Sequence, residues 1–240
     1  MEYHPRIYKS DSVLKQSKII LGSFPTWSLS QSKSLAINRE KEVTRLKNGD
    51  ISYFYGSSNN QFWHWYEKYL DANIKYLDIK SIESSLEQNN IGITDVIYKC
   101  KRNGKSALDK HLTKRLYNHN FFVYPKQGEK LKILCTSKGV LNEMLLNNMF
   151  FKTHQILRYE DQKSKDFQKQ ILNEVNGEFN LIKKPFLKVI STNSGGIIEC
   201  ISIPSPGSPY RRLKDFGFDS KDSKEFLGHY LKVVFDWFIQ

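Results

Sequence analysis

Short apolar runs alternate with amphipathic segments along this chain of 240 residues, and this alternation limits the folds that the chain can adopt. The first run, Ile19-Ile20-Leu21, stops at Gly22 and is typical of a buried strand that feeds a tight loop. Further strands are predicted over residues 91–97, 131–136, 187–190 and 197–203, and helices over 60–70, 81–89 (with Ser81 as its cap), 138–147 and 223–238. Strands that alternate with helices predict an α/β fold, a three-layer sandwich with a mainly parallel central sheet.

The length favours one domain over residues 1–240. Two polar stretches within it read as insertions, near residues 28–52 and 159–184. The first is expected to hold a helix, and the second is interpreted as a solvated helix or an insertion rather than a second domain.

The charge balance favours an anionic partner. The formal net charge is +12 and the pI is about 9.4, which indicates nucleic acid first and an anionic membrane surface second. Lysine outnumbers arginine without forming one basic block, so solubility alone is an alternative explanation. With no run of about 18 apolar residues, no membrane span is expected, and the N-terminal residues do not resemble a secretory signal.

The cysteines are three in number and far apart, at Cys100, Cys135 and Cys200. Without a CxxC spacing, neither a structural zinc site nor an iron–sulfur cluster is expected. A cytoplasmic protein that works without a metal or another cofactor is therefore predicted.

Four short motifs carry the functional signal. In chain order they are Gly22-Ser23-Phe24-Pro25; Phe54-Tyr55-Gly56 followed by Asn60-Gln61-Phe62-Trp63; Ile91 to Ile97 followed by Cys100 and Arg102; and Ile203-Pro204-Ser205-Pro206 followed by Tyr210, Arg212 and Leu213. In open α/β sheets, ligands bind beyond the carboxyl ends of the strands. Residues 22–27 and 204–212 are expected at that edge, with residues 56–60 closing over them.

In this order the motifs resemble those of the uracil-DNA glycosylase superfamily, most closely its mismatch-type and hypoxanthine-type (deoxyinosine) branches. The resemblance spans residues 19–213. It implies a single three-layer α/β domain that flips a damaged or modified base out of DNA and hydrolyses its N-glycosidic bond, leaving an abasic site, as in base-excision repair. It also implies a monomer whose partner is double-stranded DNA. The motifs contain no lysine, so no lyase step is expected.

The resemblance assigns roles to matching positions. Asn60 corresponds to the catalytic asparagine of the hypoxanthine-type branch; because an amide is a weak base, it would position water and polarise the base. Asp95 is the second catalytic candidate, as a carboxylate that positions water. The base-binding candidates are Gly22, Ser23, Phe24, Tyr55, Gly56, Ser57 and Ser58, and the DNA-binding candidates are Ser205, Pro206, Gly207, Tyr210, Arg211 and Arg212. Tyr210 or Leu213 would fill the gap in the base stack.

The chain departs from the family pattern at Ser57-Ser58, where His-Pro is usual, and at the extra Gly207 of the last motif. Such changes beside the expected pocket bear on the base rather than on the reaction. One alternative is an anti-phage glycosylase that excises a bulky modified cytosine, such as glucosylated hydroxymethylcytosine, since relatives in this superfamily are linked to phage defence. A catalytically inactive DNA-binding relative is another.

The candidates also have simpler structural explanations. Asn60 is a favoured helix N-cap, Phe24 is suited to the core, and Asp95 could satisfy the backbone of a neighbouring loop. Phe62 and Trp63 are expected in the core. The six histidines, His4, His64, His111, His119, His154 and His229, show no metal-binding spacing and are interpreted as surface or satisfied polar residues.

Overall fold

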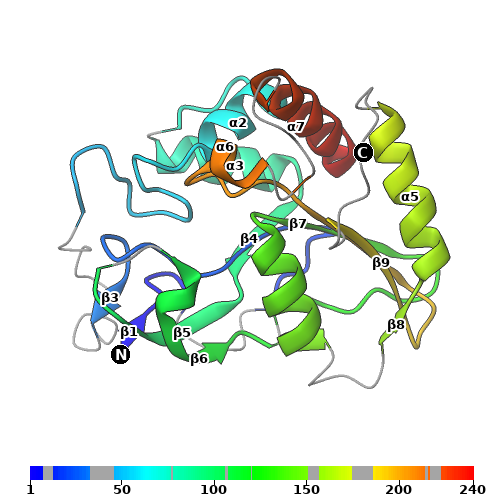
Figure 1. Ribbon diagram of the computed structural model, residues 1–240, viewed down its shortest axis with the longest axis horizontal. Coiled ribbons are helices and arrows are strands. Elements are labelled where there is room, and N and C mark those ends of the chain that lie inside the picture. Colours follow the sequence, from blue (N-terminus) through cyan, green and yellow to red (C-terminus); the bar gives the residue numbers. More distant parts are fainter. Residues whose placement is uncertain are drawn as a thin grey trace.

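A computed structural model describes residues 1–7, 13–32, 46–76, 78–105, 108–119, 121–150, 157–174, 186–213, 216 and 223–240. Within these residues, six strands form a mixed sheet in the order β4-β2-β7-β10-β9-β8 (Figure 1). The strands are β2 (Lys18–Gly22), β4 (Ile91–Asp95), β7 (Lys130–Cys135), β8 (Leu157–Tyr159), β9 (Leu187–Thr192) and β10 (Ile197–Ser202). β4, β2, β7 and β10 are parallel, whereas β9 and β8 continue the sheet antiparallel. The predicted α/β class with a mostly parallel sheet is confirmed.

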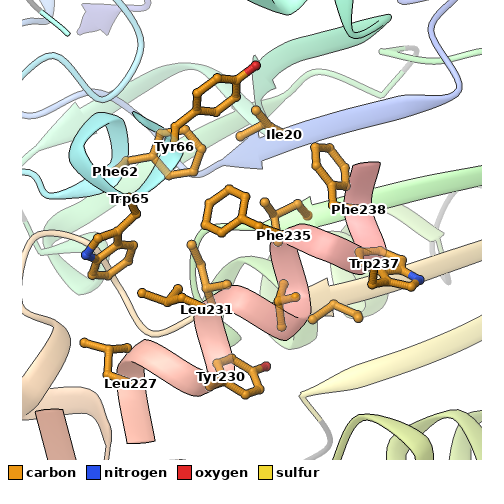
Figure 2. Close-up of a cluster of buried hydrophobic side chains, with 14 of the residues drawn as sticks. Ile20, Phe62, Trp65, Tyr66, Leu227, Tyr230, Leu231, Phe235, Trp237 and Phe238 are labelled. Atoms are coloured by element: carbon orange, nitrogen blue, oxygen red, sulfur yellow. The ribbon is translucent and has the colours of Figure 1, made fainter. Parts of the chain in front are cut away.

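Helices cover the two faces of this sheet because its strands alternate their side chains. Ile20 packs into one core with α2 (Phe62–Tyr69), α3 (Ile79–Gln88) and α7 (Ser223–Ile239), which lie together above the sheet in Figure 1. Figure 2 shows side chains of α7 gathered beside Ile20 and Phe62. Ile19 and Leu21 point the other way, into a core shared with the π-type helix η2 (Val140–Phe150).

A second sheet, antiparallel, was not predicted. It has the order β3-β1-β5-β6, with β1 (Glu2–Tyr3), β3 (Gln31–Ser32), β5 (Ile97–Arg102) and β6 (Leu112–Tyr117). The predicted strand over residues 91–97 is therefore two strands that belong to different sheets. The chain turns at Val96, whose N–H donates to the carbonyl oxygen of Gly22. Because β5 is irregular and half-exposed, its residues read as a polar segment.

The cap of one predicted helix needs correction, whereas the solvated helix predicted in the second polar stretch is present. Helix α3 is capped by Asp78, whose carboxylate accepts from Lys80 N, and not by Ser81, whose hydroxyl accepts from Lys75 N. In the second polar stretch, α5 (Asp161–Glu174) packs on β9 through Ser164, whose hydroxyl accepts from Val189 N at 2.9 Å. The rest of that stretch, and most of the helix expected over residues 28–52, lies outside the described residues. No helix of the described part is long and apolar enough to cross a membrane.

Candidate functional site

The candidate site lies where the connections of the sheet change direction. From β2 the chain passes through α2 and α3 to β4 on one side, and it returns to β7 on the other side of β2. The loops that leave β2 and β7 therefore diverge, and ligands of open α/β sheets bind at such a point. Because β2, β7 and β10 are parallel, the loops 22–27 and 204–212 leave from one edge, as expected from the sequence.

Gly22, the last residue of β2, is the point on which two polar side chains converge. A Cβ atom here would collide with the carboxylate of Asp95 and would lie 2.7 Å from the hydroxyl oxygen of Tyr55. Tyr55 reaches this place with a φ of 54°, a left-handed conformation that costs about 1–3 kcal/mol. Burial and then the charge of Asp95 raise the pKa of Tyr55 well above its usual value, so the hydroxyl keeps its proton.

Hydrogen bonds and close contacts join the four motif segments. Val96 N donates to Gly22 O at 2.9 Å, which joins the third motif to the first. Gln61 N donates to Pro206 O at 3.1 Å, which joins the second motif to the fourth. Tyr55 of the second motif lies against Gly22 of the first. The motifs that are dispersed in the sequence thus form one continuous structure.

Asn60 lies at the start of α2, and its carboxamide oxygen Oδ1 accepts a hydrogen bond from Phe62 N at 2.9 Å. The N-cap of α2 is Gln61, so the expectation that Asn60 is the N-cap is wrong by one residue, although Asn60 accepts from the first N–H group of the helix. This bond also fixes the orientation of the amide, because only the oxygen can accept from an N–H group. One lone pair of Oδ1 remains, and the side-chain NH₂ group has no hydrogen-bond partner among the described residues. The hydrogen bond from Phe62 N leaves these groups available to a ligand.

Asp95 is 3% exposed and is paired with a residue that the sequence did not single out. His4 Nε2 lies 2.9 Å from Asp95 Oδ2. The other carboxylate oxygen, Oδ1, is buried and has no hydrogen-bond partner among the described residues. The alternative role of Asp95 was to accept hydrogen bonds from the backbone of a neighbouring loop. Among the described residues, no backbone N–H group donates to its carboxylate. Asp95 thus presents a positioned carboxylate at the end of β4.

Arg102 holds the loop over residues 22–27, which is named the Phe24 loop. The guanidinium of Arg102 donates from Nη2 to Pro25 O at 2.6 Å and from Nε to Glu2 Oε2 at 2.7 Å, and it lies 5.6 Å from the centre of the Phe24 ring. The Phe24 ring is 8% exposed and packs in the core. Phe24 is therefore a core aromatic in this structure, and a base could stack on it only if the loop over residues 22–27 opened.

Ser57 and Ser58 lie on a loop that the Asp50 carboxylate joins to Ser28, the residue that follows the loop over residues 22–27. Asp50 Oδ1 accepts from Ser58 N at 2.8 Å, and Asp50 Oδ2 accepts from the Ser28 hydroxyl at 2.9 Å. Burial raises the pKa of Asp50, but the hydrogen bonds from Ser58, Ser28 and Lys47 outweigh it, and the net pKa is lowered. Ser57 is half-buried and Ser58 exposed. Gly56 closes the turn before them, since a Cβ there would strike the backbone of Ile51.

Ser23 has an acidic neighbour that the sequence did not indicate. Asp109, in the short helix η1 (Asp109–His111), lies close enough to the Ser23 side chain for that side chain to affect its pKa. Burial raises the pKa of Asp109, and the nearby Asp95 adds to this effect, while Ser23 and Arg115 oppose it. Two carboxyl groups therefore lie near the first motif, that of Asp95 at Gly22 and that of Asp109 at Ser23.

The last motif forms a tight turn beside the start of α2. Ser208 N donates to Ser205 O at 3.0 Å. Pro206 is buried and Ser205 half-buried, whereas Gly207 is exposed, with no atom within 4 Å of the place where a Cβ would lie. The extra glycine therefore adds an open tip to the turn.

The short helix α6 (Pro209–Leu213) carries the remaining DNA-binding candidates. Arg211 and Arg212 are exposed, and the Tyr210 side chain is 52% exposed. Leu213 is 1% exposed and belongs to the core that Figure 2 shows in part. The expectation that Leu213 fills a gap in a base stack is therefore wrong, because its side chain is already packed in the core.

The residues that sequence reasoning missed are His4, Glu2, Asp50 and Asp109. None of them had a local signal: His4 stands alone near the N-terminus, and its partner Asp95 is 91 positions away. The described residues contain no cluster of three or more His, Cys, Asp or Glu side chains placed to hold a metal ion. Comparison of the chain with protein-family models, curated proteins and solved structures gives no match.

Proposed function

We propose that this protein is a monofunctional DNA glycosylase of the uracil-DNA glycosylase type, which flips a damaged or modified base out of double-stranded DNA and hydrolyses its N-glycosidic bond. The observation that carries the proposal is the convergence of the four motif segments at the carboxyl edge of β2. There, Gly22, Tyr55 and Asp95 meet, and the hydrogen bond from Gln61 to Pro206 brings in the last motif.

The reaction sets the requirements of the site. The bond between C1′ and the base nitrogen breaks with its electron pair on the base, and the oxygen of water bonds to C1′. A site must hold the base edge, orient the water and stabilise the separated charges. Within the proposal, the backbone of Ser23 and Phe24 contacts the base edge, and Asp95 accepts the proton of water.

Asn60 supplies the amide that such a site needs. Its Oδ1 is fixed by the bond from Phe62 N, so the free NH₂ group has a defined direction before any DNA arrives. A donor that is already oriented stabilises negative charge on a leaving base without reorganisation during the reaction. In the proposal, Asn60 polarises the base through this NH₂ group and orients water with the second lone pair of Oδ1.

The exposed helix α6 provides the contact with the duplex. Arg211 and Arg212 bind phosphates, and the exposed Tyr210 ring enters the space that the flipped base leaves. Ser205 lies at the turn before α6, where its hydroxyl contacts a phosphate beside the flipped nucleotide. This arrangement assigns the base to the Gly22 side of the edge and the backbone to the α6 side.

A panel of duplex oligonucleotides tests the proposal. Each carries one modified base (uracil, hypoxanthine or glucosylated hydroxymethylcytosine) and a labelled strand, and alkali converts any abasic site into a strand break. We expect breaks with at least one of them. The reacting base also decides between a repair role and an anti-phage role. Binding without a break on every member of the panel would identify the protein as an inactive DNA-binding relative.

Substitutions at Asn60 separate its two roles. Asn60→Asp keeps an oxygen that accepts from Phe62 N but loses the NH₂ group, so the first N–H group of α2 keeps its acceptor while excision falls by about 10²–10³-fold. Asn60→Ala loses both the oxygen acceptor and the NH₂ group. The control is Asn59→Ala at the exposed neighbouring position, which leaves excision unchanged. Unaltered excision by Asn60→Asp would remove the amide from the mechanism.

A further inference from the structure

His4 is a buried polar residue that lies beside the proposed site. Its side chain is 2% exposed, although neutral and charged imidazoles are usually at least partly solvated. The residue is held by the antiparallel sheet: Tyr3 pairs with Lys99 of β5, and His4 N donates to Tyr98 O at 2.9 Å. The ring lies 5.1 Å from that of Phe54 and 6.1 Å from that of Phe24. It is therefore enclosed between residues of the first and second motifs.

The hydrogen bonds of the ring determine where its proton lies. Nδ1 accepts from two backbone N–H groups, those of Arg6 at 3.0 Å and Ile7 at 3.1 Å. Both are donors, so Nδ1 carries no hydrogen. A neutral ring then has its hydrogen on Nε2, and Nε2 donates it to Asp95 Oδ2 at 2.9 Å. The tautomer and the direction of the bond to Asp95 both follow from the turn over residues 4–7.

This hydrogen bond leaves the two oxygens of the Asp95 carboxylate in different environments. One oxygen, Oδ2, is engaged by His4, and the other, Oδ1, is buried without a partner and lies against the backbone of Gly22. Leaving a buried carboxylate oxygen without a hydrogen bond is unfavourable, and such exceptions concentrate where a ligand or water completes the set. Oδ1 is thus the atom with which Asp95 can receive a proton.

We infer that His4 is a positioning residue of the glycosylase reaction, and this inference rests on the function proposed above. His4 fixes the Asp95 carboxylate through Oδ2, which leaves Oδ1 as the oxygen that receives a proton from the water that attacks C1′. In the hydrolytic step the water oxygen bonds to C1′, the C1′–N electron pair leaves with the base, and Oδ1 takes the proton of water and later releases it to solvent or to the base. His4 keeps its own proton throughout.

Two isosteric substitutions distinguish positioning from a structural role. In His4→Asn, the amide oxygen lies near the place of Nδ1 and still accepts from the backbone of residues 6 and 7, but the side chain no longer reaches Asp95. In His4→Gln, the amide nitrogen lies near the place of Nε2 and still donates to Asp95. If His4 positions Asp95, the Gln variant stays within about 5-fold of the wild-type excision rate and the Asn variant loses about 10²-fold. If the turn over residues 4–7 is what matters, the order is reversed.

The experiment measures single-turnover excision, with enzyme in excess, on the oligonucleotide that the wild type cleaves. His4→Asn and His4→Gln are compared with Asp95→Asn and with the double variant His4→Asn/Asp95→Asn. Because His4 acts through Asp95, we expect the double variant to be no slower than Asp95→Asn alone, within about 3-fold. DNA affinity, measured by fluorescence anisotropy, is expected to stay within about 3-fold in all four. Circular dichroism establishes that each variant is folded.

The outcomes distinguish a failure of the proposed function from a failure of this inference. A wild type that cleaves none of the oligonucleotides overturns the proposed function, and this inference with it. An active wild type whose His4→Asn loss multiplies the Asp95→Asn loss shows that His4 acts independently of Asp95, which overturns this inference alone. Full activity of His4→Asn does the same. If His4→Asn does not fold, the Gln variant decides: a loss beyond about 30-fold in a folded protein contradicts the inference.

Discussion

Arg102 donates from Nη2 to the carbonyl oxygen of Pro25 at 2.6 Å, and this bond connects strand β5 to the loop that follows β2. The Arg102 side chain is 1% exposed, and Glu2, at 2.7 Å, balances its charge. A buried guanidinium with both a carboxylate and a carbonyl acceptor has its geometry fixed by its planar fork. The antiparallel sheet thus determines where the Phe24 loop lies.

Replacing Arg102 is expected to alter the loop without changing the charge. In Arg102→Lys the positive charge remains, but one ammonium group cannot donate to Glu2 and Pro25 with the geometry of the fork. We expect excision to fall by about 10-fold or more and the free energy of unfolding to fall by about 1–3 kcal/mol. Urea unfolding and single-turnover kinetics measure the two effects. Lys101→Gln, at the exposed adjacent position of β5, is the control and is expected to change neither.

Gly22→Ala is expected to destabilise the fold. The added methyl group would meet the Asp95 carboxylate and the Tyr55 ring, both of which are held by other contacts. Overpacking of this kind costs about 1–3 kcal/mol. Urea unfolding measures it. In the matched variant Gly139→Ala the nearest atom lies 3.6 Å away, and the free energy of unfolding should be equal to or above that of the wild type. Equal stabilities for the two variants would contradict the close approach at Gly22.

The hydrogen bonds of Asp50 make its contribution to stability depend on pH. Because its pKa is lower in the folded protein than in the unfolded chain, its stabilisation is present above the unfolded value of about 3.9 and is lost as the pH falls through the folded value. Asp50→Ala is expected to cost about 1–2 kcal/mol at pH 6, and this difference should shrink below about pH 4. Thermal unfolding from pH 3 to pH 7 measures it. The exposed Asp236 serves as the control: Asp236→Ala should stay within about 0.5 kcal/mol of the wild type at pH 6.

The two arginines of α6 are expected to set the salt dependence of DNA binding. Each phosphate contact contributes about 0.9 to the slope of log K against log salt for a duplex. Arg211→Gln/Arg212→Gln should therefore reduce the slope by about 1.8. Fluorescence anisotropy from 50 to 300 mM salt, in the Asn60→Asp background, measures the slope. Lys165→Gln/Lys169→Gln on α5 removes the same charge from another exposed surface and should leave the slope within about 0.5. Equal slopes in both double variants would assign the basic surface to solubility.

The parts of the fold that follow from local patterns were predictable. The buried run of β2 and the apolar face of α7 are visible in the sequence because burial on one or both sides leaves a continuous or periodic apolar signal. The antiparallel sheet left no such signal. β1 has two residues, and β5 is half-exposed with irregular pairing to β6. The antiparallel sheet depends on pairing between residues about 100 positions apart, such as Glu2 with Cys100.

The candidate site was predictable to the same degree. Asn60 and Asp95 could be named because they lie in motifs. The partner of Asp95 could not, since the sequence around His4 shows only a lone histidine, and the tautomer of its ring depends on a turn that forms in the folded chain. Similarly, the prediction that Leu213 fills a gap in the base stack was wrong, because a residue that follows two exposed arginines can still face the core.

The shared use of Asn60 has an evolutionary consequence. The N–H group of Phe62 needs only an oxygen acceptor at this position, and Asp, Ser or Thr can supply one. Selection for folding alone therefore tolerates these three residues, whereas under the proposed function selection for turnover tolerates only the amide. In homologous sequences, loss of catalysis would appear as Asp, Ser or Thr at position 60 with the rest of the second motif intact, and position 60 would then mark the descendants that still bind DNA but no longer process it.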